Sequence, residues 1–187
     1  MPNGRFVLTS HGTQGGTGRA TGWYPPGASH PHAGLASRRG GETPTDPGGR
    51  GDDVSRAFPG DPAVGDGLHS TAAQADADPA ARDAVFPAGG HGTMWDFRGD
   101  PDPAGVHGGG VVGAVCHGPA GLTDVVPFPP RDAPRVAGAR AGTAPGFAAN
   151  TVVAGRPVTG RNPASARGVG EGMGYLPGAA TTGRGTR

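Results

Sequence analysis

The sequence contains no lysine and no isoleucine, and cysteine and aromatic residues are scarce. Its 187 residues include one Cys, two Trp, two Tyr and six Phe. A single cysteine excludes an internal disulfide. No apolar run approaches the roughly 20 residues that a membrane span needs, and residues 1–12 lack the apolar core of a secretion signal. These absences predict a cytoplasmic chain that does not span a membrane.

Charge of either sign is not in excess. All sixteen basic residues are arginine, and fifteen acidic residues leave a net charge of +1. The arginines are interleaved with aspartates, so no basic stripe for nucleic acid is visible. The absence of lysine and isoleucine indicates a bias toward GC-rich codons rather than a selected surface.

Glycine and proline are abundant instead, with 39 Gly and 21 Pro. Such a share without a period is typical of low-complexity or disordered chains. Glycine shows no triplet repeat, which excludes collagen, and the many breakers exclude a coiled coil. Because each ordered residue costs about 1–2 kcal/mol of backbone entropy, this composition makes folding difficult.

Short apolar runs nevertheless predict a sheet. Three of them end abruptly in glycine or polar residues, as strands of a parallel sheet buried on both faces do, and a fourth segment reads as a hairpin about Gly155. The strands are expected at Arg5–Ser10, Asp83–Phe86, Gly110–Cys116, and Thr151–Ala154 with Val158–Thr159. Chemistry in such sheets lies beyond the carboxyl ends of the strands.

Helices are harder to find. No clean amphipathic helix is expected between Gly12 and Asp83, although Asp52–Phe58 and Ala72–Val85 carry some helical character and Pro79 cuts the second. The low helical propensity of this region therefore conflicts with a doubly wound fold, which needs helices between its parallel strands. The expected organisation is a single α/β domain over residues 1–167, followed by a Gly-rich, disordered tail over residues 168–187.

The strongest local motif runs from Val112 to Ala120. A strand of small residues leads into Cys116, His117 and a Gly-Pro pair, as in a nucleophile elbow. A thiol at a helix start has a lowered pKa, and an adjacent histidine can take its proton. The alternative is a small buried cysteine at the end of a strand.

A second glycine loop follows the strand at Asp83–Phe86. It runs through Gly89, Gly90 and His91 to Asp96. Glycine allows close approach of the backbone, so N–H groups of this loop are candidates for an oxyanion hole.

Taken together, these segments resemble the DJ-1/PfpI family of the class I glutamine amidotransferase-like superfamily, and within it the Hsp31-like chaperone and glyoxalase III branch. Eight motifs occur in family order: VLTSHG at 7–12, TGWY at 21–24, HPH at 30–32, LAS..GGE at 35–42, DAVF..GGHG.MWD at 83–96, AVCHGPA at 114–120, GLTDVVPF at 121–128 and G.PVTG.NPAS at 155–165.

The resemblance implies a flavodoxin-like, mostly parallel sheet with helices on both faces, usually as a homodimer. It implies Cys116 as the nucleophile, His117 as its catalytic partner, and the amides of Gly90 and His117 as oxyanion donors. The expected pocket residues are Gly89, His91, Trp23 and His30. Family activities include conversion of methylglyoxal to lactate without glutathione, hydrolysis and holdase chaperoning. The expected partners are a small aldehyde or dicarbonyl and unfolded proteins, with no metal and no organic cofactor.

Two family carboxylates are missing from this chain. The acid that contacts the cysteine is replaced by Gly27, and the segment carrying the acid that orients the histidine is deleted after Ala120. Asp124 matches a different family position. Helical and strand segments between His32 and Leu35 and between Pro101 and Val111 are also shortened. The resemblance therefore predicts a degenerate member with weak or no catalysis.

Two other hypotheses remain open at this stage. One is a non-enzymatic holdase or thiol sensor that uses exposed apolar surface or oxidation of Cys116. The other is a non-functional, largely disordered product.

Weaker motifs have ordinary explanations. The Gly-rich segment 12–18 lacks the Lys of a phosphate-binding loop, and two Arg-Gly-Asp tripeptides, at 50–52 and 98–100, are expected by chance. His30 and His32 lack a third ligand nearby in sequence, so no metal site is expected there.

Overall fold

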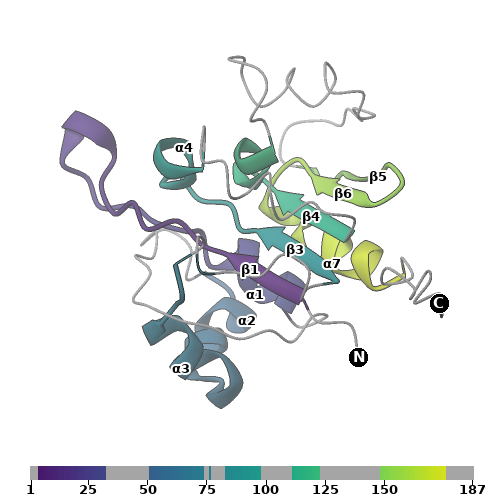
Figure 1. Cartoon of the computed structure of the whole chain (residues 1–187), viewed down its shortest axis with the longest axis horizontal. Helices are drawn as coiled ribbons and strands as arrows, with labels where there is room; N and C mark the ends of the chain where they lie inside the picture. The colour runs from purple at the N-terminus through teal and green to yellow at the C-terminus, as the bar shows by residue number, and fades with distance from the viewer. Residues whose placement is uncertain are drawn as a thin grey trace, which may run out of the picture.

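A five-stranded sheet forms the centre of the molecule (Figure 1). The computed structural model describes residues 4–32, 51–73, 76, 83–97, 111–122 and 148–175. The strand order is β1-β3-β4-β6-β5, parallel throughout except for the antiparallel β5–β6 pair. The strands are β1 (Gly4–Val7), β3 (Ala84–Pro87), β4 (Val111–Val115), β5 (Thr151–Val153) and β6 (Pro157–Gly160). The predicted α/β class, the parallel strands and the hairpin about Gly155 are confirmed.

Helices of four to ten residues and single 3-10 turns connect and cover these strands. The α-helices are α1 (Pro26–His32), α2 (Asp53–Ala57), α3 (Pro62–His69), α4 (Thr93–Asp96) and α7 (Ala166–Tyr175). The 3-10 turns are η1 (Gly15–Thr17), η3 (Phe58–Gly60), η6 (Gly118–Leu122) and η7 (Pro163–Ser165). Among the described helices, none is long and apolar enough to cross a membrane.

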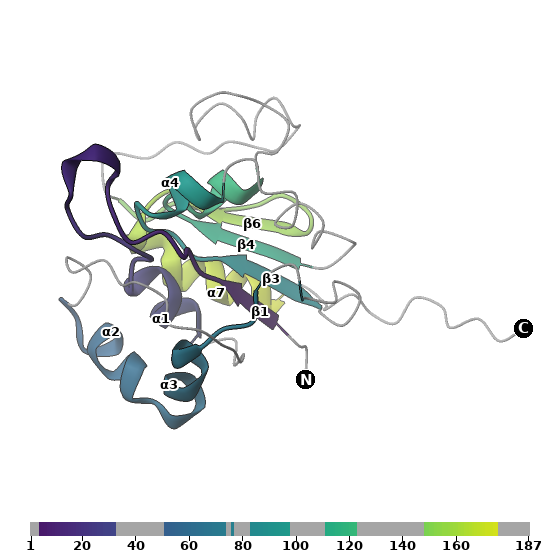
Figure 2. The ribbon, with the colours of Figure 1, turned by 60° about the vertical axis from the view of Figure 1, so that its left-hand side comes forward.

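The sheet is buried on both faces, as its apolar runs predict. All residues of β3 and β4 are buried. Side chains alternate between the faces of a strand, so Phe86 joins the main core while its neighbour Val85 packs with Val7 and Phe97 on the other face. The main core lies between the sheet and the layer of α1 and α7, which Figure 2 shows beneath the strands.

Helix α1 lies between Gly12 and Asp83, where no clean amphipathic helix was expected and where its segment was not among the helical candidates. Its sequence PGASHPH contains a glycine and two prolines, which disfavour a helix in isolation. Pro26 occupies the first position, where its missing N–H costs nothing. The helix packs on α7, and a Cβ added at Gly170 of α7 would lie 2.8 Å from Cα of Pro31. Tertiary packing of small residues therefore outweighs local propensity.

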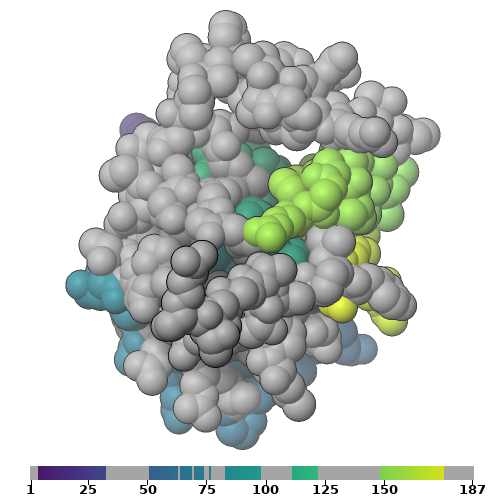
Figure 3. Space-filling model, turned by 45° about the vertical axis from the view of Figure 1, so that its right-hand side comes forward, coloured from purple at the N-terminus to yellow at the C-terminus, as the bar shows by residue number. Residues whose placement is uncertain are grey.

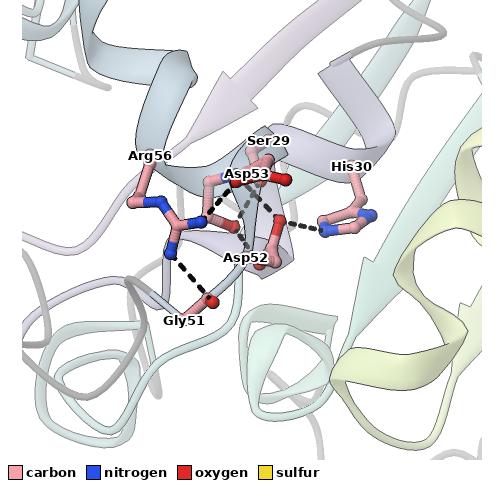
Figure 4. Close-up of polar contacts among 7 residues, drawn as sticks. Ser29, His30, Gly51, Asp52, Asp53 and Arg56 are labelled. Carbon is pink, nitrogen blue, oxygen red and sulfur yellow. Dashed lines mark hydrogen bonds and ion pairs between the residues drawn. The ribbon is translucent and has the colours of Figure 1, made fainter.

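Helix α2 is present in the segment where helical character was expected. Asp52 is its N-cap, because its side chain accepts a hydrogen bond from the backbone N–H of Ser55 at 2.9 Å. The same carboxylate accepts from the Ser55 hydroxyl at 2.7 Å and lies 3.1 Å from Nε2 of His30 (Figure 4). This network attaches α2 to α1. The second candidate segment, Ala72–Val85, is described only in part, and Ala84 and Val85 at its end belong to β3.

Helix α7 corrects the position of the expected tail. The tail was placed at residues 168–187, but α7 continues to Tyr175. Val169 and Met173 are buried in the main core, because the apolar positions of this glycine-rich segment recur on one helical face. The rest of the expected tail, residues 176–187, lies outside the described residues.

The β5–β6 hairpin forms the outer edge of the sheet, and the face in Figure 3 shows it at the molecular surface. Val153 of β5 is exposed. Two buried residues after β6, Asn162 and Ser165, connect the hairpin to α7. The Ser165 hydroxyl donates to Oδ1 of Asn162 at 3.2 Å and accepts from the N–H of Asn150 at 2.9 Å.

Because α7 packs closely on β4, we predict that a larger residue at Gly113 destabilises the fold. A Cβ at this position would overlap the sulfur of Met173 and lie 2.8 Å from Cδ2 of Phe86. We expect Gly113→Ala to lower the free energy of unfolding by about 1–3 kcal/mol, measured by urea denaturation. The matched control is Gly16→Ala, where an added Cβ meets nothing within 4 Å. Equal midpoints for the two variants would contradict this packing.

A half-buried histidine predicts acid sensitivity. His32 lies between the rings of Phe6 and Phe58, at centroid distances of 5.8 and 5.1 Å, and its Nε2 is buried without a hydrogen-bond partner. Burial lowers the pKa of His32, with Asp61 opposing the shift. The unfolded chain therefore binds protons first as the pH falls below about 6.5.

We accordingly expect stability to be complete above that pH and to decline as the pH falls toward the lowered pKa of His32. Urea midpoints at pH 7.5 and 5.5 measure this decline. His32→Leu should reduce the difference between the two midpoints, since leucine carries no titrating group into the pocket between Phe6 and Phe58. An unchanged difference in this variant would show that His32 does not titrate on unfolding.

Candidate active site around Cys116

Cys116 occupies a strained turn at the carboxyl end of β4. Its φ of 57° is the only positive φ at a non-glycine residue in the described part of the chain. Such a conformation costs on the order of 1–3 kcal/mol, so neighbouring contacts must hold it. One of these is the backbone N–H of Cys116, which donates to the carbonyl of Gly160 at 3.0 Å. The predicted nucleophile elbow is thus present as a backbone conformation.

Glycines let two loops approach this turn closely. A Cβ on Gly89 would lie 2.7 Å from the carbonyl oxygen of Val115 and 3.1 Å from Cβ of Cys116. A Cβ on Gly118 would overlap the carbonyl oxygen of Pro87. Real side chains do not fit at either position, so the loop after β3 lies directly against the elbow.

His117 lies within reach of the Cys116 sulfur. Nδ1 of His117 is 3.5 Å from Sγ of Cys116. Burial raises the pKa of the Cys116 thiol, and the backbone N–H of His117 opposes that shift. Burial also lowers the pKa of His117, and His91 lowers it further. The resting pair is therefore a neutral thiol beside a neutral imidazole, rather than a thiolate–imidazolium pair.

Of the two predicted oxyanion donors, Gly90 lies on the loop after β3 and His117 in the turn after β4. Gly90 has a φ of 140°, and an added Cβ would lie 2.6 Å from Cα of Trp23. The buried Thr93 hydroxyl is 2.8 Å from the carbonyl oxygen of Gly90 and 3.5 Å from that of His117. Thr93 thus connects the two loops whose amides are the predicted oxyanion donors, and their binding of an oxyanion stays a prediction.

The expected pocket residues are only partly gathered. Gly89 borders Cys116, and the ring of exposed His91 lies 5.1 Å from that of His117. Trp23 is buried in the main core, with its ring 6.0 Å from Phe58. The hydrogen bond described for His30 is to Asp52 on the α2 side. The structure therefore gathers Gly89 and His91 with the Cys116–His117 pair. The backbone of Trp23 adjoins Gly90 while its ring lies in the main core, and the described hydrogen bond of His30 is on the α2 side.

Gly27 lies where a side chain would enter this region. It is buried in α1, and an added Cβ would meet the Gly89 nitrogen at 3.5 Å and Cγ1 of Val115 at 3.6 Å. Both are ordinary contact distances, so a Cβ fits at this position, where the family resemblance places a carboxylate. Asp124, the other carboxylate considered, lies outside the described residues.

No metal centre is formed by the part of the chain that the structure describes, since no group of three or more His, Cys, Asp or Glu side chains is suitably placed.

Sequence reasoning missed a carboxylate that fastens the loop after β1. Oδ2 of Asp96 accepts hydrogen bonds from the Thr9 hydroxyl at 2.7 Å, the Ser10 N–H at 2.7 Å and the His11 N–H at 3.2 Å. The ring of His11 stacks on Trp95 at 5.1 Å. The motifs at 7–12 and 83–96 were both identified in the sequence. Only the structure shows that Asp96 of the second motif anchors the backbone of the first.

The bridging hydroxyl of Thr93 yields a stability prediction. Thr93→Val keeps the shape and removes the donor to the buried Gly90 carbonyl, so we expect a loss of about 1–3 kcal/mol in unfolding free energy. The control is Thr17→Val, whose exposed hydroxyl donates to the Gln14 carbonyl at 2.7 Å and should cost less than about 0.5 kcal/mol. Urea denaturation compares the two variants. A Thr93 variant as stable as the control would show that the Thr93 hydroxyl does not stabilise the contact between the two loops.

Comparisons with known proteins support the fold. No family model and no curated protein matches the chain by sequence. Among solved structures, Rapid Encystment Protein 24 kDa (REP24) of Francisella tularensis is 26% identical with a TM-score of 0.80, covering 93% of this chain and 98% of that chain.

Glyoxalase III of Candida albicans is 22% identical with a TM-score of 0.77, covering 92% of this chain and 95% of that chain. At that identity the likeness concerns the fold. Both matches extend over nearly the whole length of both partners. The chain is thus a structural match to the DJ-1/PfpI family, REP24 and glyoxalase III among its members.

Proposed function

We propose that the chain is a DJ-1/PfpI-type protein whose ancestral chemistry is the cysteine-dependent conversion of methylglyoxal to lactate, and that this activity is weak here. The observation that carries the proposal is the elbow. Cys116 takes its strained φ of 57° with Nδ1 of His117 at 3.5 Å from the sulfur. The similarity to a glyoxalase III supports the substrate class.

The chemistry would proceed in two stages. The proton of the Cys116 thiol moves to His117, the sulfur bonds to the aldehyde carbon of the dicarbonyl, and the aldehyde oxygen takes the proton, giving a hemithioacetal. His117 then takes the hydrogen of that carbon as a proton and gives it to the neighbouring ketone carbon, while the hydroxyl proton of the hemithioacetal moves to the ketone oxygen, which leaves a thioester of lactate. Water cleaves the carbon–sulfur bond of the thioester, releasing lactate and restoring the thiol, so the net reaction adds one water.

The electrostatics of the site favour weak turnover. The pKa of Cys116 is raised and that of His117 is lowered, mainly because both groups are buried. Both shifts disfavour the charged pair that attacks the aldehyde. General acid–base catalysis contributes about 10²–10⁴-fold, so a pair that is rarely charged loses part of this factor. No carboxylate among the described residues is seen to contact His117 to offset the effect.

The test measures lactate formation from methylglyoxal by the full chain without glutathione. We expect slow turnover in the wild type and none in Cys116→Ala. Gly27→Glu should increase kcat, because its side chain would start 3.5 Å from the Gly89 nitrogen, next to the elbow. Gly27→Gln is the matched control, since it has the same size and no ionisable proton.

Two results would overturn the proposal. One is lactate formation that persists in Cys116→Ala. The other is the absence of lactate from both the wild type and Gly27→Glu, although each variant retains the near-UV circular dichroism of a packed core.

A further inference from the structure

A second imidazole stands beside the Cys116–His117 pair. The ring of His91 lies 5.1 Å from that of His117, centroid to centroid, with a tilt of 43°. His91 is exposed, whereas His117 is half-buried. His91 reaches this place from the loop after β3, and His117 from the turn after β4, so the two rings meet only in the folded chain.

The backbone fixes where His91 lies. Gly90, the residue before it, is packed so closely against the segment 22–24 that an added Cβ would lie 2.6 Å from Cα of Trp23 and 2.7 Å from the nitrogen of Tyr24. After it, the Thr93 hydroxyl contacts the carbonyl oxygens of both Gly90 and His117. The two histidine-bearing loops are therefore held against each other.

We propose that His91 is a positioning residue that adds to the effect of burial on the Cys116–His117 pair, helping to hold His117 uncharged and, through it, Cys116 as a protonated thiol. The sign of the charge beside His117 determines whether its imidazolium form is stabilised or destabilised. A carboxylate beside His117 would attract an imidazolium, whereas a histidine can only be neutral or positive. His91 thus acts on the sulfur through His117. The consequence for turnover rests on the proposed function, but the charge state of the pair does not.

The titration of His117 agrees in direction. Burial lowers the pKa of His117, and repulsion from His91 lowers it further. Among the described residues, the titratable side chains seen to face His117 are Cys116 and His91. Replacing His91 by aspartate leaves the burial unchanged and turns repulsion into attraction, so His117 would accept the thiol proton at a lower cost.

The lone cysteine makes this measurable. Because the chain has one Cys, the rate of alkylation by iodoacetamide reports the thiolate of Cys116 alone. We measure this rate from pH 5 to 9.5 for the full-length wild type, His91→Asp and His91→Asn. We expect His91→Asp to move the profile to lower pH and to increase the rate at pH 7 by about tenfold, the equivalent of one pKa unit. The neutral His91→Asn should give a smaller shift in the same direction.

A second measurement follows the imidazole itself. The ring C–H resonances of His117 report its titration by NMR, and its midpoint should rise in His91→Asn and rise further in His91→Asp. Near-UV circular dichroism from Trp23 and Trp95 checks that each variant is folded. If His91→Asp does not fold, the asparagine variant and the NMR titration decide the question.

Wild-type alkylation profiles and an unmoved His117 titration in the folded variants would overturn the inference. Neither readout uses a dicarbonyl. A chain that makes no lactate but shows the predicted shifts would therefore refute the proposed function alone, and lactate formation without the shifts would refute this inference alone.

Discussion

The site depends on one constraint, the close backbone contact between the turn at Cys116 and the loop after β3. A non-glycine residue with φ of 57° persists only when its surroundings compensate for the strain. Here Gly89 and Gly118 let the two backbones touch, and any side chain at either position would collide with a carbonyl oxygen. The Thr93 hydroxyl also contacts carbonyl oxygens of both the loop and the turn. The positions of His91 and His117 follow from this contact.

Close backbone contact at glycines is also found in the rest of the core. Glycine-rich sequence usually indicates disorder, yet several glycines here stand where α7 approaches its neighbours. Met173 occupies the space over Gly113, and Gly170 lies against Pro31 of α1. A chain with few large side chains can still fill a core if its backbones come close together, because packing density rather than residue size determines the dispersion energy. Such a core is sensitive to substitution of these glycines, since one added methyl group has no space to occupy.

The geometry and the electrostatics of the site have opposite effects on the chemistry. The elbow keeps the sulfur beside an imidazole, and burial then favours the uncharged form of both groups. In a low-dielectric site, an uncompensated charge is expensive. The described part of the chain places Gly27 and His91, rather than a carboxylate, near the Cys116–His117 pair, so the elbow geometry is present without a described acid to favour the charged pair.

The sequence by itself determined the strands, the order of motifs and the elbow, because apolar runs ending in glycine and the Val-Cys-His-Gly pattern are local features. Only the tertiary structure decided the helices α1 and α7. Their prolines and glycines oppose helix formation locally, and contacts between distant segments overcome that preference. Likewise, burial in the folded chain raises the pKa of Cys116, and the ring of His117 lies beside that of His91, which is 26 positions away in sequence. Interactions of this kind are fixed by spatial proximity, and no local pattern encodes them.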